Sequence, residues 1–306
     1  MTKEIYLSGG CYWGTQHLFS LVDGVRETEV GFANGHTDSP TYEEVYTDTT
    51  GFAETVRVRY NPSVVSLDFL LACFFRSIDP FSLNRQGGDA GTRYRTGIYY
   101  TSEEDIPKIE AAFSRVEKRL GGRPVTECGP LQNFFPAHEA HQDYLRKNPG
   151  GYCHIPLKTF TYVRLLQDLA YLLGDEADIV ARMANAASLI RERTGWFWVG
   201  FYRVDGEQLV LGPFQGTPAC QRIGYGKGVC GTAWERGETI VVPDVEQFPG
   251  HIACSNASRS EIVVPLRDGN EVRAVLDIDS TDLGTFDLTD ALWLEAVAGT
   301  VYSAKA

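Results

Sequence analysis

The sequence predicts an α+β protein of two domains. Its 306 residues correspond to about two domains of roughly 150 residues each. A turn-rich stretch, NPGGYCHIP, ends near residue 157, and no internal repeat or long linker is present. In the second half, short β-rich runs follow one another between two helical patterns. We therefore expect one domain over residues 1–157 and a second over residues 158–306.

The first half contains one clear strand pattern and several helix patterns. Residues 55–60 alternate apolar and charged side chains, which predicts a half-buried strand. Glu54 shares the parity of the apolar set, so its carboxyl should point inward. A helix should follow Cys11 and run to Leu21. Further helices are predicted over residues 67–78, 102–121 and 137–147.

The second half begins with an amphipathic helix pattern over residues 175–193. Five β-rich runs follow, separated by turn residues, over 196–204, 208–214, 238–242, 261–266 and 272–278. A last helix pattern covers residues 289–301. Strands in series with helices on either side predict an antiparallel sheet flanked by helices.

Composition and charge exclude several classes of protein. Hydrophobic residues make up 43% and charged residues 22%, which is typical of a globular chain. The formal charge of −12 argues against nucleic acid or an anionic membrane as the main partner. The longest apolar run, residues 69–75, is far shorter than the about 20 residues of a membrane-spanning helix. The beginning of the chain has no apolar signal segment, so we expect a soluble, cytoplasmic protein.

Seven cysteines stand out in such a chain. A reducing compartment makes a static disulfide framework unexpected, so they should be core residues, metal ligands or redox thiols. Cys73 lies inside an apolar helix pattern and is expected in the core. Cys128 is either an extra recycling thiol or an ordinary exposed cysteine.

Cys11 lies in the segment GGCYWG, directly before a predicted helix. Free N–H groups and the positive end of the helix dipole favour a thiolate there, with a pKa below about 8.5. Tyr12 and Trp13 could form an apolar pocket beside it. The alternative is a structural cysteine buried in a glycine-rich turn.

The segment GCYWG resembles the GCFWG motif of the MsrA-type methionine sulfoxide reductases. The resemblance continues through PTYEEVYTDTTGFAETVRVRY, IDPFSLNRQGGDAGTRYRTGIY and FFPAHEAHQDYLRKNPGGYC, and covers about residues 3–156. It implies an MsrA-like α/β sandwich that reduces the S epimer of methionine sulfoxide, free or in peptides. Two departures are Phe52, where the family has His, and Gln16, where Glu is common.

The resemblance also implies roles for individual residues. Cys11 would be the nucleophile, Glu54 the acid and Cys153 the resolving thiol. The implied substrate-binding residues are Tyr12, Trp13, Tyr42, Asp89 and Tyr94. The residue types suit the chemistry, because a sulfoxide oxygen leaves readily only once protonated, and a carboxyl in an apolar pocket keeps its proton to higher pH. The cysteine then becomes a sulfenic acid, which a second thiol converts to a disulfide.

A second group of cysteines, Cys220, Cys230 and Cys254, lies in the second half. Gaps of ten and twenty-four residues lack the close pairs of a structural zinc site, which favours redox thiols. His251, three residues before Cys254, leaves a zinc-binding module as an alternative.

Three carboxylates accompany these cysteines. Asp277 and Asp279 lie two apart on a predicted strand and so share a face, and Glu261 begins a neighbouring strand. Three close carboxylates repel one another unless a cation binds between them, and an α-ammonium group is a natural candidate. A metal site or solvated strand ends are the alternatives.

From about Tyr162 onward, the sequence resembles the GAF-domain free methionine-(R)-sulfoxide reductases, through the segments WVGFY, LGPFQG, GVCGTA, VPDV and LDIDS. This implies a GAF-like antiparallel sheet flanked by helices. Cys254 would be the nucleophile, with Cys220 and Cys230 as resolving thiols in no fixed order. The implied substrate-binding residues are Trp198, Tyr202, Glu261, Asp277 and Asp279.

Together the two resemblances imply a fusion of two reductases, one for each epimer of methionine sulfoxide. No metal or cofactor is expected, and both families imply thioredoxin as the external dithiol reductant. The alternative is an MsrA-type reductase regulated by a C-terminal GAF redox or ligand sensor.

Overall fold

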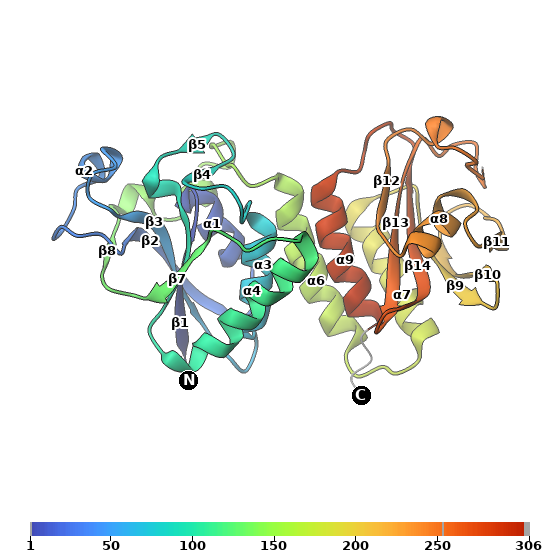
Figure 1. Cartoon of the computed structure of the whole chain (residues 1–306), viewed down its shortest axis with the longest axis horizontal. Coiled ribbons are helices and arrows are strands. Elements are labelled where there is room, and N and C mark those ends of the chain that lie inside the picture. The colour runs from blue at the N-terminus through green and yellow to red at the C-terminus, as the bar shows by residue number, and fades with distance from the viewer. Residues whose placement is uncertain (1, 253, 303–306) are drawn as a thin grey trace. The chain divides into compact units, whose positions relative to one another are not determined.

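The computed structural model describes residues 2–252 and 254–302. Its chain divides into two compact units, Met1–Val163 and Arg164–Ala306 (Figure 1). The division falls within helix α6 (Leu157–Leu173), which begins at the turn-rich seam of the sequence. Each unit has its own six-stranded sheet.

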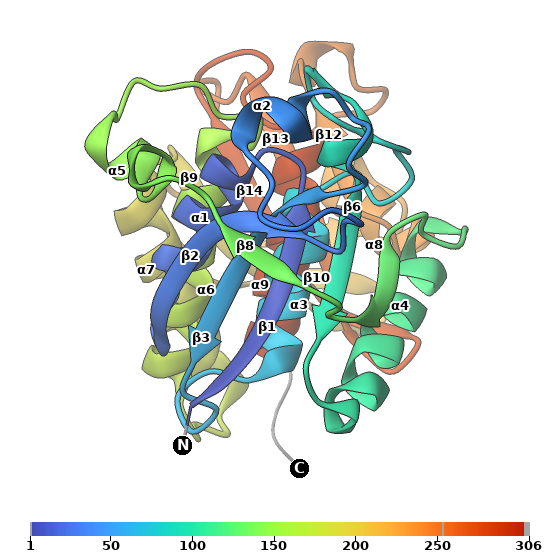
Figure 2. The ribbon, with the colours of Figure 1, turned by 90° about the vertical axis from the view of Figure 1, so that its left-hand side faces the viewer.

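The first unit is built on a sheet with the strand order β7-β6-β1-β3-β2-β8. Its strands are β1 (Lys3–Gly9), β2 (Val25–Ala33), β3 (Ala53–Tyr60), β6 (Thr96–Tyr100), β7 (Glu127–Pro130) and β8 (Phe134–Pro136). All neighbouring pairs are antiparallel except β6 and β7, which are parallel. Figure 2 shows β1, β3 and β2 side by side, with α2 (Tyr42–Tyr46) near one end of them. A small hairpin, β4 (Arg85–Gln86) and β5 (Asp89–Ala90), completes the strands.

The helices of the first unit are α1 (Tyr12–Ser20), α2, α3 (Leu67–Ser77), α4 (Ile106–Leu120) and α5 (Tyr144–Lys147). Three 3₁₀ turns, η1 (Thr92–Tyr94), η2 (Glu103–Asp105) and η3 (Glu139–His141), connect other elements. Helix α1 contacts β2 and β3, while α3 contacts β1 and α4. Helices packed on a mixed sheet confirm the predicted sandwich.

The continuous helix predicted over residues 137–147 is wrong. The segment forms η3, then an extended Gln142, then Asp143 with a φ of 52°, and only afterwards α5. The reason lies in the Gln142 side chain. Its Oε1 accepts a hydrogen bond from the Val30 N–H at 2.9 Å, and its Nε2 donates to the Val30 carbonyl at 2.9 Å. These bonds hold the segment against β2 in a conformation that a helix could not adopt.

The second unit is built on a fully antiparallel sheet with the order β11-β10-β9-β14-β13-β12. Its strands are β9 (Trp198–Asp205), β10 (Gln208–Gln215), β11 (Arg222–Gly224), β12 (Ile240–Val242), β13 (Ser260–Asp268) and β14 (Glu271–Ser280). Helices α7 (Ile179–Thr194) and α9 (Leu288–Tyr302) lie on one face, and α8 (Gly228–Arg236) on the other (Figure 1). The 3₁₀ turn η4 (Val245–Gln247) follows β12. The predicted antiparallel sheet with flanking helices is confirmed.

Helix α8 was not predicted, because its segment is short and rich in glycine. Packing requires a glycine at position 231, because a Cβ there would lie 2.4 Å from the Gly224 carbonyl oxygen. Glycine therefore lets α8 approach the end of β11 closely, at the expense of helix propensity.

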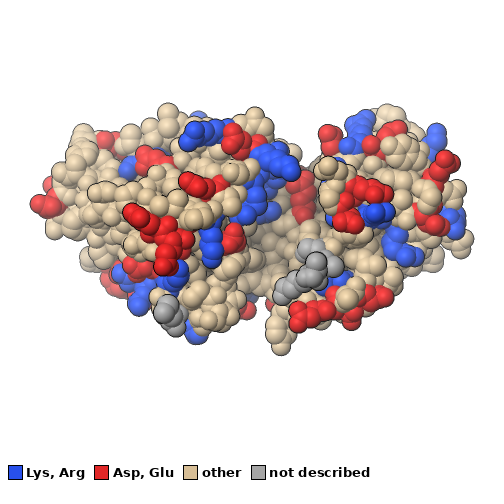
Figure 3. Space-filling model, turned by 60° about the horizontal axis from the view of Figure 1, so that its bottom comes forward, with Lys and Arg blue, Asp and Glu red and all other residues tan. Residues whose placement is uncertain are grey.

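Charged side chains of both signs are intermingled on the face drawn in Figure 3. Across residues 2–252 and 254–302, no helix combines the length and apolar character needed to cross a membrane.

Candidate active sites

Cys11 occupies the junction between β1 and α1. It is the N-cap residue of α1 and is only 6% exposed. Gly10, directly before it, has a φ of 81°, and a Cβ there would lie 2.5 Å from the Cβ of Gln86. Only glycine fits such a turn without strain, so the chain fixes the thiol at the start of the helix.

Glu54 lies on β3 with its side chain buried, as its parity predicts. The Tyr12 backbone N–H donates a hydrogen bond to Glu54 Oε2 at 3.0 Å. Burial raises the pKa of Glu54 to about 8, against the opposing effects of the Tyr12 N–H and of Arg93. The Glu54 carboxyl therefore holds a proton at neutral pH, and it lies next to the backbone of Tyr12.

The expected lowering of the Cys11 pKa is wrong. Burial raises the pKa of the thiol well above its ordinary value, and the charges of Glu54 and Asp89 add to the rise. The Trp13 backbone N–H, a free donor at the start of α1, lowers the Cys11 pKa. This effect is smaller than the rise caused by the loss of solvation. Cys11 is therefore a thiol rather than a thiolate at neutral pH.

A stack of rings lies beside Cys11. The Trp13 ring stacks on Tyr144 at 3.8 Å between centroids and on His141 at 5.9 Å. His141 in turn stacks on Tyr42 at 4.7 Å. Sequence reasoning did not name His141 or Tyr144 as site residues. The interruption of the predicted helix between η3 and α5 places both rings beside Trp13. The signal that could have found them was their position within the segment that resembles the family. Tyr12 is 1% exposed, and its ring lies 5.9 Å from that of His141.

Hydroxyl groups surround Glu54 from other elements. The Tyr46 and Tyr94 hydroxyls lie 3.0 Å apart, and the Tyr42 ring lies 4.4 Å from that of Tyr46. The charge of Glu54 is among the causes that raise the pKa of Tyr42 and Tyr94, after burial. Both hydroxyls therefore keep their protons and can donate hydrogen bonds. Sequence reasoning also missed Tyr46, which follows Tyr42 by one helical turn.

Cys153 lies over the first turn of α1. A Cβ at Gly14 would lie 3.0 Å from Cys153 Sγ, so glycine leaves room for this sulfur. Two contacts hold its segment: the His154 Nε2 lies 2.8 Å from the Gly9 carbonyl oxygen, and the Tyr152 hydroxyl donates to Asp89 Oδ2 at 3.0 Å. Burial raises the pKa of Cys153. Both thiols of this site are free.

The second unit contains a pocket that brings together most of the residues predicted there. Its lining includes Trp198, Tyr202, Cys230, Cys254, Glu261, Asp277 and Asp279. Cys220 is the exception, but it forms a disulfide with Cys254. Cys230 remains free and buried. Of the two partners that the sequence left open for Cys254, the structure thus pairs Cys220.

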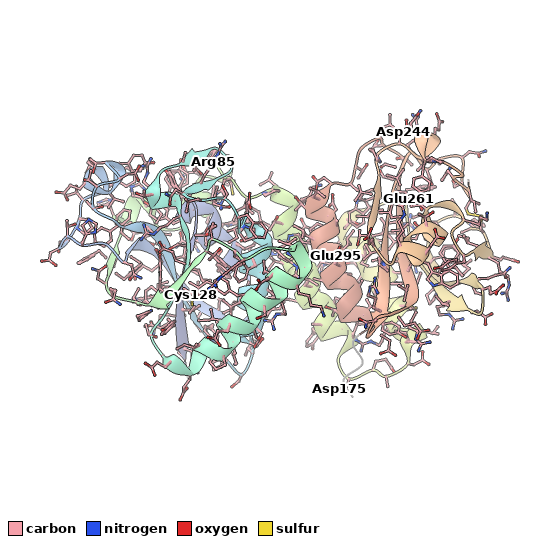
Figure 4. The ribbon with its side chains drawn as sticks, in the orientation of Figure 1. Arg85, Cys128, Asp175, Asp244, Glu261 and Glu295 are labelled. Carbon is pink, nitrogen blue, oxygen red and sulfur yellow. A yellow bond between two sulfur atoms is a disulfide. The ribbon has the colours of Figure 1, made fainter. Side chains whose placement is uncertain are left out.

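Sheet register explains why the three carboxylates meet. Glu261 on β13 lies opposite Asp279 on β14, and Asp277 lies two residues along the same face. Burial and the neighbouring acids raise the pKa of Glu261 and Asp277 well above the usual range. Burial raises the pKa of Asp279 to about 6, against a hydrogen bond from Ser258. Such a cluster gains free energy when a cation enters it. Figure 4 labels Glu261.

Aromatic side chains form another wall of the pocket. The Trp198 indole N–H donates to the Thr217 carbonyl at 3.0 Å, and its ring stacks on Phe214 at 5.4 Å. The Tyr202 hydroxyl donates to the Cys220 carbonyl at 3.1 Å, which fixes the backbone next to the disulfide. Sequence reasoning missed Ser258.

The remaining cysteines lie elsewhere. Cys73 is buried in α3, as expected for a core residue, and Cys128 is exposed on β7 (Figure 4).

Comparison with known proteins separates the chain at the same region. The family model "Peptide methionine sulfoxide reductase" matches residues 3–168, and the model "GAF domain" matches residues 175–304. The peptide methionine sulfoxide reductase MsrA of Clostridium perfringens is 50% identical over 155 residues, which are 51% of this chain and 99% of that protein.

Two solved structures resemble the second half. The free methionine-R-sulfoxide reductase of Neisseria meningitidis, solved in complex with its substrate, is 51% identical with a TM-score of 0.46, and the match covers 47% of this chain and 87% of that one. A putative GAF sensor protein of Burkholderia vietnamiensis is 44% identical with a TM-score of 0.47, covering 49% of this chain and 96% of that one.

Proposed function

The chain belongs to the peptide methionine sulfoxide reductase family, whose model matches more than half of its length. On this basis we propose that its two units reduce different epimers of the same substrate. The enzyme reduces methionine sulfoxide to methionine. The first unit acts on the S epimer, free or in peptides, and the second on the R epimer of the free amino acid. The observation that supports this most is that each unit combines a cysteine pair with a buried carboxyl of raised pKa.

In the first unit, Cys11 Sγ attacks the sulfoxide sulfur while Glu54 donates its proton to the sulfoxide oxygen. The protonated oxygen then passes to Sγ as its bond to the methionine sulfur and the new Sγ–S bond both break. Methionine leaves, Cys11 becomes a sulfenic acid, and the proton lost from the thiol returns to Glu54. Cys153 then attacks Cys11 Sγ, water leaves, and a disulfide forms. An external dithiol reduces that disulfide by thiol exchange.

The ring stack suits the other end of the substrate. A methyl group on sulfur would fit against the Trp13 ring, whose position Tyr144 and His141 fix by stacking. The hydroxyls of Tyr42 and Tyr94, with Asp89 nearby, would hold the oxygen in reach of Glu54. Tyr12, whose ring lies 5.9 Å from that of His141, would help Trp13 to hold the methyl group.

In the second unit, the ammonium group of a free amino acid would bind among Glu261, Asp277 and Asp279. A methionine sulfoxide within a peptide has no such charge to offer and would leave these acids unpaired, so binding favours the free amino acid. Cys254 is the proposed nucleophile and Cys220 the resolving thiol, which the disulfide between them supports.

We further propose that thioredoxin supplies the electrons and that the enzyme works in the cytoplasm, where such a reductant is available. Neither unit needs a cofactor for this thiol chemistry.

Separated epimers test the proposal directly. The intact protein with thioredoxin should turn over the free S, N-blocked S and free R forms, but not the N-blocked R form. Turnover of the S forms alone would contradict the assignment of the second unit and favour a sensor. In that case free methionine-(R)-sulfoxide would bind without consuming thiols, which a thiol titration of the full chain measures.

A further inference from the structure

Cys230 is the thiol of the second unit that the disulfide leaves free. Its Sγ, an oxygen of Glu261 and an oxygen of Asp277 all lie within 4.8 Å of one another, and all three residues are buried. The His251 Nε2 lies 3.8 Å from Glu261 Oε2. One thiol, two carboxylates and an imidazole therefore converge from α8, β13, β14 and the segment before Cys254.

Asp277 gives an independent sign that a ligand fits here. Its side chain lines the pocket and is 7% exposed, yet its Oδ1 has no hydrogen-bond partner among the described residues. Buried polar atoms are rarely left unpaired in native proteins, because the lost hydration costs free energy. Cys230 and Glu261 can donate hydrogen bonds to the Asp277 carboxyl only while they keep their own protons. Neither brings a positive charge to the cluster, as a bound cation would.

We propose that a Zn²⁺ ion binds between Cys230, Glu261 and Asp277, with His251 or water as the fourth ligand, and that it blocks the pocket. Zinc binds Cys sulfur at about 2.3 Å and His nitrogen or carboxylate oxygen at about 2.0 to 2.2 Å in tetrahedral geometry, so its ligand atoms lie roughly 3 to 4 Å apart. The observed separations need only a small closure to reach this. The thiolate selects zinc over magnesium and calcium, which prefer oxygen ligands.

This site differs from the zinc module considered from the sequence. That alternative relied on His251 with Cys254, but Cys254 is bonded to Cys220. The proposed ion is an inhibitor rather than a resident cofactor. It occupies the carboxylates that would otherwise bind the substrate ammonium group, and this competition rests on the function proposed above.

Metal titration of the full chain tests the site without using activity. Cd²⁺ serves as a probe for Zn²⁺, since a cysteine ligand gives it an ultraviolet thiolate charge-transfer band. Wild type should bind one ion more than Cys230→Ser. The Cys128→Ser variant is the matched control, because Cys128 is an exposed thiol in the other unit, and it should match wild type. Equal metal binding by wild type and Cys230→Ser would overturn the proposal.

A second variant guards against misfolding of Cys230→Ser. Glu261→Gln keeps the thiol but removes a charged ligand. It should weaken Zn²⁺ binding by at least about 10- to 100-fold, because mutation of a residue that only hydrogen-bonds to a metal ligand already lowers affinity by that much. Competition with a chromophoric chelator measures the affinity. An unchanged affinity in this variant would also overturn the site.

Competition is read from kinetics. Zn²⁺ should raise the KM for free methionine-(R)-sulfoxide with kcat unchanged, and a chelator should reverse the effect. A fall in kcat with constant KM would contradict blocking of the pocket. If the R epimer is not turned over even without metal, the proposed function of the second unit fails, while the titration still decides whether the metal site exists.

Discussion

The backbone N–H of Tyr12 donates a hydrogen bond to Glu54 Oε2 at 3.0 Å. The residue directly after Cys11 thus holds the buried acid in place, so helix α1 positions both the thiol and its proton donor. The arrangement explains how two groups 43 residues apart in the sequence act at one point.

Glu54→Gln should slow turnover of the S epimer by about 10² to 10⁴, the usual contribution of a general acid. Gln keeps the size and can still accept the Tyr12 hydrogen bond, but it has no proton to give. Single-turnover kinetics on an N-blocked S substrate measure the chemical step. Turnover of the free R epimer by the same variant is the internal control, and a decrease of less than threefold on S would exclude Glu54 as the acid.

Cys11→Ser and Cys254→Ser should have opposite effects. The first should abolish S turnover and leave R turnover intact, and the second should do the reverse, because each unit supplies its own nucleophile. The assay is the same four-substrate comparison for both variants. Loss of both activities in either variant would refute independent sites.

Gly14→Ala should slow the resolving step. The added Cβ would lie 3.0 Å from Cys153 Sγ, so the sulfur must shift by a few tenths of an ångström. We expect a normal first turnover followed by accumulation of the Cys11 sulfenic acid, which a dimedone-type probe with mass spectrometry detects. Gly299→Ala is the matched control, since a Cβ there meets nothing within 4 Å in helix α9.

Glu54 should also make stability depend on pH. Its pKa is about 8 in the folded protein and about 4.3 in an unfolded chain, so the folded state holds the proton more tightly. The associated stability is fully present below about pH 4 and is lost as pH rises through 8, by up to about 1.4 kcal/mol per pH unit.

Chemical unfolding of wild type and Glu54→Gln at pH 6 and pH 8.5 measures this effect. Gln does not titrate, so the variant should gain stability relative to wild type as pH rises. A stability difference that stays constant between the two pH values would show that Glu54 does not titrate in this range.

The sequence predicted the features that depend on local pattern. The alternation of residues 55–60 placed Glu54 inward, and the spacing of Asp277 and Asp279 placed both carboxyls on one face of a strand. Other features depend on contacts far along the chain. The helix pattern over residues 137–147 gave no sign that Gln142 would bind Val30, 112 residues away. The rise in the Cys11 pKa likewise follows from burial, which the helix-start argument ignored.

The choice between Cys220 and Cys230 was beyond sequence reasoning for a similar reason. Both follow glycine-containing turns. The packing of α8 buries Cys230 against Asp277, while the Tyr202 hydroxyl holds the backbone of the half-buried Cys220. The periodicity of a short, glycine-rich segment carries no information about such packing.

The Gln142 amide has a further effect on the border of the first sheet. Strand β8 pairs with β2 at residues 31–33, and the Ala137 N–H donates to the Val30 carbonyl at 2.9 Å. Without a further partner, the Val30 N–H would be unpaired. The Gln142 Oε1 accepts from this N–H, as a neighbouring strand would, and its Nε2 gives the Val30 carbonyl a second hydrogen bond. Exposed strand borders are templates on which other chains can add and aggregate. A single side chain therefore extends the protected part of this border by one residue, without the cost of a longer strand.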